Sequence, residues 1–179
     1  MDGGGARLNA PLPGSRLRID LARQQLALLA ADGAGLAAWA ISSAANGPGE
    51  RNGSGCTPRG RHRIRALIGA GTPADTVFVG RRPTGEIYDA ALAARYPARD
   101  WILTRILWLC GEQPGFNRGG AVDSMRRYIY IHGTPATEPM GVPASHGCIR
   151  LHTPALLELF PRCYAGMPVL IDSEQETDA

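Results

Sequence analysis

Glycine and proline recur along almost the whole length of the chain, and they limit its fold more than any other feature. The 23 glycines and 14 prolines exceed a fifth of the 179 residues. Glycine adopts the positive φ angles of tight turns, and proline interrupts helices and sheet ladders. We therefore expect abundant turns and irregular connections between short regular elements.

Between these turns lie short segments with the pattern of β-strands. Leu17, Ile19 and Leu21 alternate with charged residues, as in a half-buried strand, and the aromatic and β-branched run over 126–132 also favours a strand. Further strands are expected over 25–29, 36–43, 62–68, 76–79, 86–88, 101–109 and 167–171, and a helix stays open as the alternative for 101–109. The clearest helix has Thr153 as its N-cap and Pro154 at its first position. The sequence thus predicts a mainly-β protein with a short helix near the C-terminus.

The length of the chain fits one domain with a real hydrophobic core. We expect a flexible lead-in over 1–14, one domain over 15–172 and an acidic tail over 173–179. No run of 18 apolar residues is present, so no transmembrane segment is predicted. The first residues lack the basic and apolar regions of a secretory signal, which predicts a cytoplasmic protein or a chain without its export segment.

The charged residues exclude one kind of catalysis and indicate little about partners. All 19 basic residues are arginine, so no lysine amine can act as a nucleophile. The net charge of +3 is too small to indicate a nucleic acid partner. Arg61, Arg63 and Arg65 share one face of an expected strand. That face is either a solvated surface or a site for an anionic polymer that bears carboxylates.

Two stretches, 131–134 and 145–150, carry the residues of a cysteine nucleophile. A thiol becomes a useful nucleophile when a nearby imidazole accepts its proton. His146 lies two residues before Cys148, and His132 lies sixteen residues before it. His132, at the end of an expected strand, is the better base if the intervening loop folds back.

The neighbours of Cys148 suit the chemistry of acyl transfer. Gly147 lacks a Cβ, so the N–H groups of Gly147 and Cys148 are candidates for an oxyanion hole. Arg150 is a candidate anchor for a substrate carboxylate, and a structural ion pair is the alternative. We also expect a depressed pKa for Cys148, because His132 can supply the counter-charge of a thiolate.

At these residues the sequence resembles the L,D-transpeptidase catalytic domain, the YkuD-like family. The motif reads His132, a loop, and then Ser145-His146-Gly147-Cys148-Ile149-Arg150, and the likeness extends over about 15–172. The resemblance implies a β-sandwich or open barrel that modifies peptidoglycan in the periplasm or cell envelope, with roles in cell-wall biogenesis and cell shape. No cofactor is implied.

The resemblance also implies a mechanism. Cys148 attacks the carbonyl before the terminal D-residue of a stem tetrapeptide, and an amine of a second stem resolves the thioester. By position, His132 is the base, and the Gly133 carbonyl orients it. The family's pocket residues correspond to Ser145, His146, Gly147 and Arg150. Carbapenem-type β-lactams are implied as inhibitors that acylate the same thiol.

Three alternatives stay open at this point. Water in place of the amine makes the protein an L,D-carboxypeptidase, a hydrolase. A non-catalytic peptidoglycan-binding module is a second possibility. The third is a zinc site built from His132, His146, Cys148 and His152. The pairs Tyr128/Tyr130 and Trp101/Trp108 are assigned to the core, as are Cys110 and Cys163, and Cys56 has no assigned role.

Overall fold

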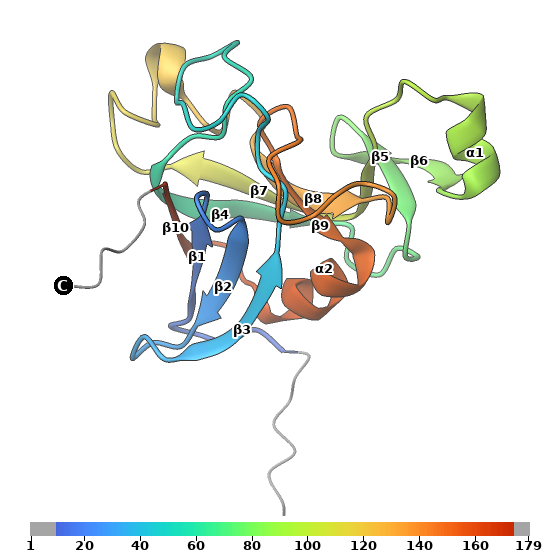
Figure 1. Cartoon of the computed structure of the whole chain (residues 1–179). Helices are drawn as coiled ribbons and strands as arrows, with labels where there is room; N and C mark the ends of the chain where they lie inside the picture. Colours follow the sequence, from blue (N-terminus) through green and yellow to red (C-terminus); the bar gives the residue numbers. More distant parts are fainter. Residues whose placement is uncertain (1–9, 174–179) are drawn as a thin grey trace, which may run out of the picture.

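The computed structural model describes residues 10–173, which form one curled, half-barrel sheet (Figure 1). Eight of its strands follow the order β3-β2-β1-β10-β4-β7-β5-β6, and β8 and β9 extend the sheet from β7. The strand bounds are β1 Arg16–Asp20, β2 Gln25–Leu29, β3 Gly35–Ala40, β4 Gly60–Ile68, β5 Thr76–Val79, β6 Arg82–Ile87, β7 Ile102–Gly111, β8 Tyr130–Thr134, β9 Ile149–His152 and β10 Pro168–Asp172. The predicted mainly-β fold is confirmed.

Strand β7 is the centre of the arrangement, because strands flank it on both edges. β4 pairs with its second half, β5 pairs with its first residues, and β8 lies on the opposite edge. Leu103 therefore pairs with Val77 on one side and with Gly133 on the other. Burial on both faces explains why the sequence of β7 is almost continuously apolar.

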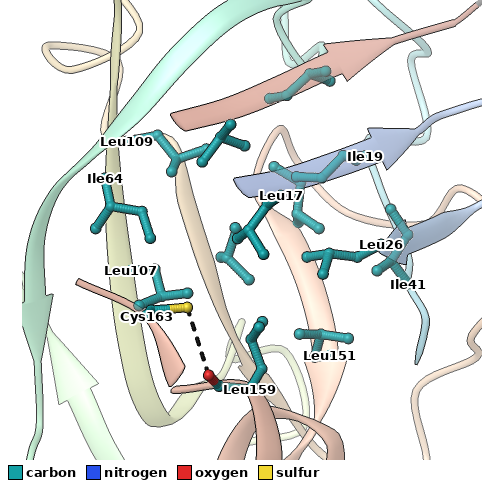
Figure 2. Packing of buried hydrophobic residues seen from close by; sticks show 14 of the residues in the cluster. Leu17, Ile19, Leu26, Ile41, Ile64, Leu107, Leu109, Leu151, Leu159 and Cys163 are labelled. Atoms are coloured by element: carbon teal, nitrogen blue, oxygen red, sulfur yellow. Dashed lines mark hydrogen bonds between the residues drawn. The ribbon is translucent and has the colours of Figure 1, made fainter. Parts of the chain in front are cut away.

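The main core fills the inside of the curl, between the sheet and the helix α2, Thr153–Leu159 (Figure 2). Residues distant in sequence meet there, among them Leu17, Ile64, Leu107, Leu159 and Cys163. The Cys163 thiol donates to the Leu159 carbonyl at 3.5 Å, and burial raises its pKa to about 12. Cys163 thus packs as a small apolar residue, as expected.

The start of α2 differs from the prediction. Thr153 is the first helical residue, and His152 is the N-cap without a side-chain capping bond. The Thr153 hydroxyl instead donates to Asp75 at 2.8 Å and meets the Thr104 hydroxyl at 2.8 Å. The side chain that the sequence assigned to a cap therefore joins the helix to distant parts of the sheet.

Two further differences concern strands and helices near the site. The predicted strand over 126–132 begins only at Tyr130, because 124–128 form turns and Tyr128 has a φ of 56°. The helix α1, Ala90–Arg95, and the strand β9 were not predicted. His132 is therefore the third residue of a five-residue strand and does not end it.

The last predictions that concern the fold are those for the two ends of the chain and for the arginine face. Of the predicted lead-in and tail, 1–9 and 174–179 lie outside the described residues. Arg61, Arg63 and Arg65 are exposed on one face of β4, and the intervening His62 and Ile64 are buried, as the alternation predicts. Within the described chain, no helix is both long and apolar enough to span a membrane.

Candidate active site

The parallel pairing of β8 with β9 places His132 and Cys148 on one face of the sheet. His132 pairs with Arg150, and Ile131 pairs with Ile149. Paired residues share a face, and so do residues two apart along a strand. Cys148 directly precedes β9, so its side chain lies on the same face as the imidazole. The loop between the strands thus folds back as the sequence argument required, and Figure 1 shows the two strands side by side over α2.

The His132 ring has a fixed tautomer. It is 2% exposed, and its Nδ1–H donates to the Gly133 carbonyl at 2.7 Å. A carbonyl can only accept, so the neutral ring carries its lone pair on Nε2. No residue over 10–173 is hydrogen-bonded to Nε2. The ring is therefore prepared to accept a proton at the atom that faces away from Gly133.

The Cys148 thiol is held by the backbone that leads into β8. Its Sγ accepts a hydrogen bond from the Tyr130 N–H at 3.3 Å and donates to the Tyr128 carbonyl at 3.4 Å. Within the described residues, no hydrogen bond joins Sγ to His132. The thiol and the imidazole thus lie on one face without a hydrogen bond between them, and catalytic hydrogen bonds often tighten only when substrate binds.

The expected depressed pKa of Cys148 is wrong for this resting state. Burial raises the pKa of the thiol to about 11, and the Tyr130 N–H offsets only part of that increase. Burial also lowers the pKa of His132, although its bond to Gly133 opposes the effect. Both groups are therefore neutral near pH 7, and a thiolate–imidazolium pair does not form in advance.

The pKa of Cys148 leads to a prediction for the free protein. The rate of alkylation of Cys148 by iodoacetamide, followed by peptide mass spectrometry, is expected to rise with pH without reaching a plateau below pH 9.5. The ordinary thiol value is about 8.5, and burial shifts the midpoint upward. An unfolded sample provides the reference midpoint. A plateau at or below the reference midpoint would show that the thiolate is stabilised after all.

The Ser145 hydroxyl stabilises the conformation of residues 145–148, the loop that contains the candidate nucleophile Cys148 and that we call the nucleophile loop. It donates to the Cys148 carbonyl at 2.5 Å and accepts the Gly147 N–H at 3.2 Å. The Gly147 carbonyl accepts from the Thr57 hydroxyl at 2.9 Å. Gly147 has a φ of 136°, and a Cβ there would lie 3.3 Å from the Cys56 carbonyl oxygen. The glycine is thus required by both its backbone conformation and its close packing.

These contacts change the proposed oxyanion hole. The Gly147 N–H is already bound to Ser145 and is not free to meet an oxyanion. The Cys148 N–H has no acceptor among the described residues. Of the two predicted donors, only the N–H of Cys148 is therefore available in this conformation.

Arg150, two residues beyond Cys148, is buried in a charge network. Its guanidinium donates to Asp100 at 2.8 Å and to Glu138 at 3.3 Å, and its side chain is 6% exposed. Asp100 also accepts from His146 Nδ1 at 3.0 Å. Burial alone would raise the pKa of Asp100, but the His146 bond and the Arg150 charge lower it. The geometry favours the structural ion pair that the sequence left open for Arg150.

A cavity of about 210 Å³ opens beside this network. Its wall includes Asp100, Glu138, His146 and Arg150, together with Trp101 and Thr134. The His146 side chain is 79% exposed, and its Nδ1 is held by Asp100, so Nε2 is left for a ligand or water. The cavity is thus a polar recess beside the His146 and Arg150 side chains, suited to the backbone and polar groups of a peptide.

Comparison with known proteins decides the family. The sequence matches the profile of the L,D-transpeptidase catalytic domain over residues 14–171. The chain belongs to this family. No curated protein matches its sequence. The family match confirms the resemblance that His132 and the motif over 145–150 indicated.

Three solved structures illustrate the likeness of the fold. An L,D-transpeptidase from Xylanimonas cellulosilytica is 20% identical, with a TM-score of 0.51 over 93% of this chain and 63% of that one. An Enterococcus faecium L,D-transpeptidase with a cysteine-to-serine substitution is 17% identical, with a TM-score of 0.52 over 88% and 49%. The L,D-transpeptidase LdtMt1, solved with imipenem, is 14% identical, with a TM-score of 0.51 over 89% and 59%. This chain spans less than two thirds of each of them.

Several residues of this L,D-transpeptidase domain that surround the site were not singled out from sequence. Asp100 and Glu138 contact Arg150, and Thr57 holds the nucleophile loop. Arg127 donates to the carbonyls of Gly49, Glu50 and Cys56, which fixes the loop against which Gly147 packs. Their partners lie tens of residues away along the chain, so no local pattern marks them. The likeness to the family over about 15–172 includes these positions, but it assigned them no role.

The zinc alternative finds no support in the arrangement. His152 Nε2 is bonded to the Glu138 carbonyl at 2.9 Å, and Cys148 is bonded to backbone groups. Among residues 10–173, no three histidine, cysteine, aspartate or glutamate side chains converge as metal ligands. The four cysteines are free thiols, and Cys110 accepts from the Arg63 guanidinium at 3.3 Å.

Proposed function

We propose that this chain is an L,D-transpeptidase that acts on peptidoglycan stem peptides through a Cys148 thioester, with His132 as the base. The observation that carries the proposal is the parallel pairing of β8 with β9. This pairing places the Cys148 thiol and the His132 imidazole on one face of the sheet, and the bond to the Gly133 carbonyl fixes the tautomer of the imidazole. A nucleophile, a base and a group that orients the base are the parts that covalent acyl transfer needs.

In the first half of the reaction, Sγ attacks the carbonyl carbon before the terminal D-residue. The thiol proton passes to His132 Nε2 as the C–S bond forms, because both groups are neutral at rest. The Cys148 N–H donates to the developing oxyanion. The C–N bond then breaks, His132 returns the proton to the departing amine, and a thioester remains.

In the second half an amine of another stem attacks the thioester carbonyl. His132 accepts a proton from that amine and returns it to the sulfur as the C–S bond breaks. The Gly133 carbonyl stabilises the imidazolium in both halves, because it holds Nδ1–H at 2.7 Å. Ser145 and Gly147 keep the loop in shape, and His146, oriented by Asp100, contacts the substrate in the cavity.

Two further statements belong to this proposal. The family is generally associated with the cell wall, and we assign this chain to the periplasm or cell envelope. We also expect carbapenem-type β-lactams to acylate Cys148, since LdtMt1 was solved with imipenem. The strained β-lactam carbonyl meets the same nucleophile as the stem peptide.

The proposal is tested by incubation of the protein with a stem tetrapeptide and a D-amino acid, with the products weighed by mass spectrometry. We expect an exchanged or cross-linked peptide, because the thioester transfers its acyl group to an amine. Tripeptide alone would identify an L,D-carboxypeptidase, in which water resolves the thioester. Unchanged peptide, with no adduct on the protein, would favour a non-catalytic binding module and contradict the proposal.

Incubation with imipenem provides the matched measurement of the first half. A single adduct is expected on the peptide that contains Cys148, and none on those that contain Cys56, Cys110 or Cys163. Cys110 and Cys163 are buried, and the Cys56 thiol donates to the carbonyls of Asn46 and Ser54, with no histidine bonded to it among the described residues. An adduct at another cysteine would show that the thiol at the end of the loop is not the nucleophile.

A further inference from the structure

Arg81 lies against three aromatic side chains next to the nucleophile. Its guanidinium carbon is 4.4 Å from the centre of the Trp108 ring and 5.0 Å from that of Tyr128. One of its terminal nitrogens donates to the Tyr130 hydroxyl at 2.9 Å. Stacking of this kind orients a planar guanidinium and limits its rotation. We call Arg81, Trp108, Tyr128 and Tyr130 the arginine platform.

Arg81 has a backbone conformation that is unfavourable for a residue with a side chain. It lies with Gly80 in the two-residue turn between β5 and β6, and the two φ angles are 54° and 65°. This is the geometry of a type I′ hairpin, which suits glycine or asparagine. A non-glycine residue at positive φ is uncommon and points to a requirement for its side chain. Nothing in the turn itself requires an arginine.

The arginine platform adjoins Cys148 directly. The Tyr128 carbonyl and the Tyr130 N–H are the two backbone groups that hold Sγ. Cys148 and Trp108 both pack against the small core cluster that contains Tyr130. Tyr130 is buried, as the sequence predicted, but Tyr128 is 54% exposed, so this side of the platform is open to solvent.

Most N–H groups of the Arg81 guanidinium have no hydrogen-bond partner within the described chain, and no carboxylate there is paired with its charge. Among the described residues it bonds to the Tyr130 hydroxyl alone, and it forms no ion pair. Arg150, by contrast, is bound to Asp100 and Glu138. Of these two arginines, Arg81 is therefore the one whose charge is not paired with a carboxylate among the described residues. Its planar fork matches a carboxylate.

We propose that the arginine platform is a subsite that binds a carboxylate of the stem peptide, with Arg81 as the residue that recognises it. The inference rests on the proposed function, which supplies a carboxylate-bearing peptide at Cys148. Trp108 and Tyr128 hold the guanidinium in place, and its free N–H groups bind the carboxylate beside the scissile carbonyl. The assignment replaces Arg150, whose charge is already paired with Asp100 and Glu138, as the anchor for substrate charge.

The test measures binding in a protein that cannot turn over, which separates it from the catalytic proposal. Calorimetric titration of Cys148→Ala gives the Kd for a stem tetrapeptide whose third residue bears a side-chain carboxylate. The peptide is compared with versions amidated at the C-terminus or at that side chain. Loss of a charge-assisted hydrogen bond is expected to weaken binding about 10- to 100-fold for one amidated version, which identifies the carboxylate.

The same titration is repeated after Arg81→Gln in the Cys148→Ala background. The unmodified peptide is then expected to bind about 10- to 100-fold more weakly, and the preference over the amidated version should disappear. Arg82→Gln is the matched control, because Arg82 is the exposed next residue of the same hairpin. It should leave both Kd values unchanged.

A second variant separates the loss of recognition from a damaged fold. Arg81→Gly suits the positive φ of the turn, so the hairpin should form at least as readily as in the parent. It is expected to show the same weakened binding as Arg81→Gln. The inference would be overturned if Cys148→Ala bound the unmodified peptide and both amidated peptides equally. It would also be overturned if an Arg81 variant still preferred the unmodified peptide. Neither result depends on whether the unmutated protein catalyses transfer.

Discussion

Turnover of a stem tetrapeptide is expected to disappear when Cys148 is changed to alanine and to fall about 10³-fold when His132 is changed to glutamine. Alanine removes the only atom that can form the thioester. Glutamine removes the proton acceptor, and general base catalysis contributes about 10²- to 10⁴-fold. His132 matters because the resting thiol, with a pKa of about 11, is not ionised near neutral pH. Product formation by mass spectrometry checks both variants.

The pH dependence of turnover distinguishes a catalytic role of His132 from a structural one. The pH profile of the unmutated enzyme should lose activity on the acidic side below pH 6.5, since burial lowers the pKa of His132 and the base must be neutral. His132→Gln should lack that acidic limb. A variant that retained the limb would show that His132 is not the base.

The strands could be predicted, and Cys148 could be singled out as a candidate nucleophile, because both depend on local sequence. Alternation in β1 and the apolar run of β7 follow from which faces are buried. Cys148 is recognisable because its loop needs a glycine at positive φ and a hydroxyl three residues earlier, all within a few positions. His132 was the better candidate base on the condition that the loop between it and Cys148 folds back, and the pairing of β8 with β9 meets that condition.

The properties that the sequence did not predict correctly depend on contacts between residues that are far apart in the chain. The pKa of Cys148 is set by burial against the turn before β8, which no spacing reveals. The donors of Arg150 are occupied by Asp100, fifty residues away. Tyr128 has the composition of a strand residue but ends a turn at positive φ, and its ring is exposed. In each case the partner in space, and not the residue type, decided the outcome.

A buried histidine outside the site should make the fold sensitive to acid. His62 is 0% exposed; its Nδ1–H donates to the Gly60 carbonyl at 3.0 Å, and its Nε2 accepts from the Ser124 hydroxyl at 2.8 Å. Burial lowers its pKa from the ordinary 6.5 to about 4. Between these values the unfolded chain binds a proton that the folded one does not. The contribution of the neutral His62 to the free energy of unfolding is therefore fully present above pH 6.5 and is lost as the pH falls towards 4.

The loss that His62 causes is expected to reach about 3 kcal/mol by pH 4, since one pKa unit corresponds to about 1.4 kcal/mol. Urea unfolding at pH 7 and pH 4 measures the free energy of unfolding. In His62→Gln the decline should be smaller by about that amount, even if the variant is less stable at pH 7. His146→Gln is the control, because its ring is largely exposed, and it should keep the full decline. An undiminished decline in His62→Gln would place the acid sensitivity elsewhere, with His132 as the next buried imidazole to test.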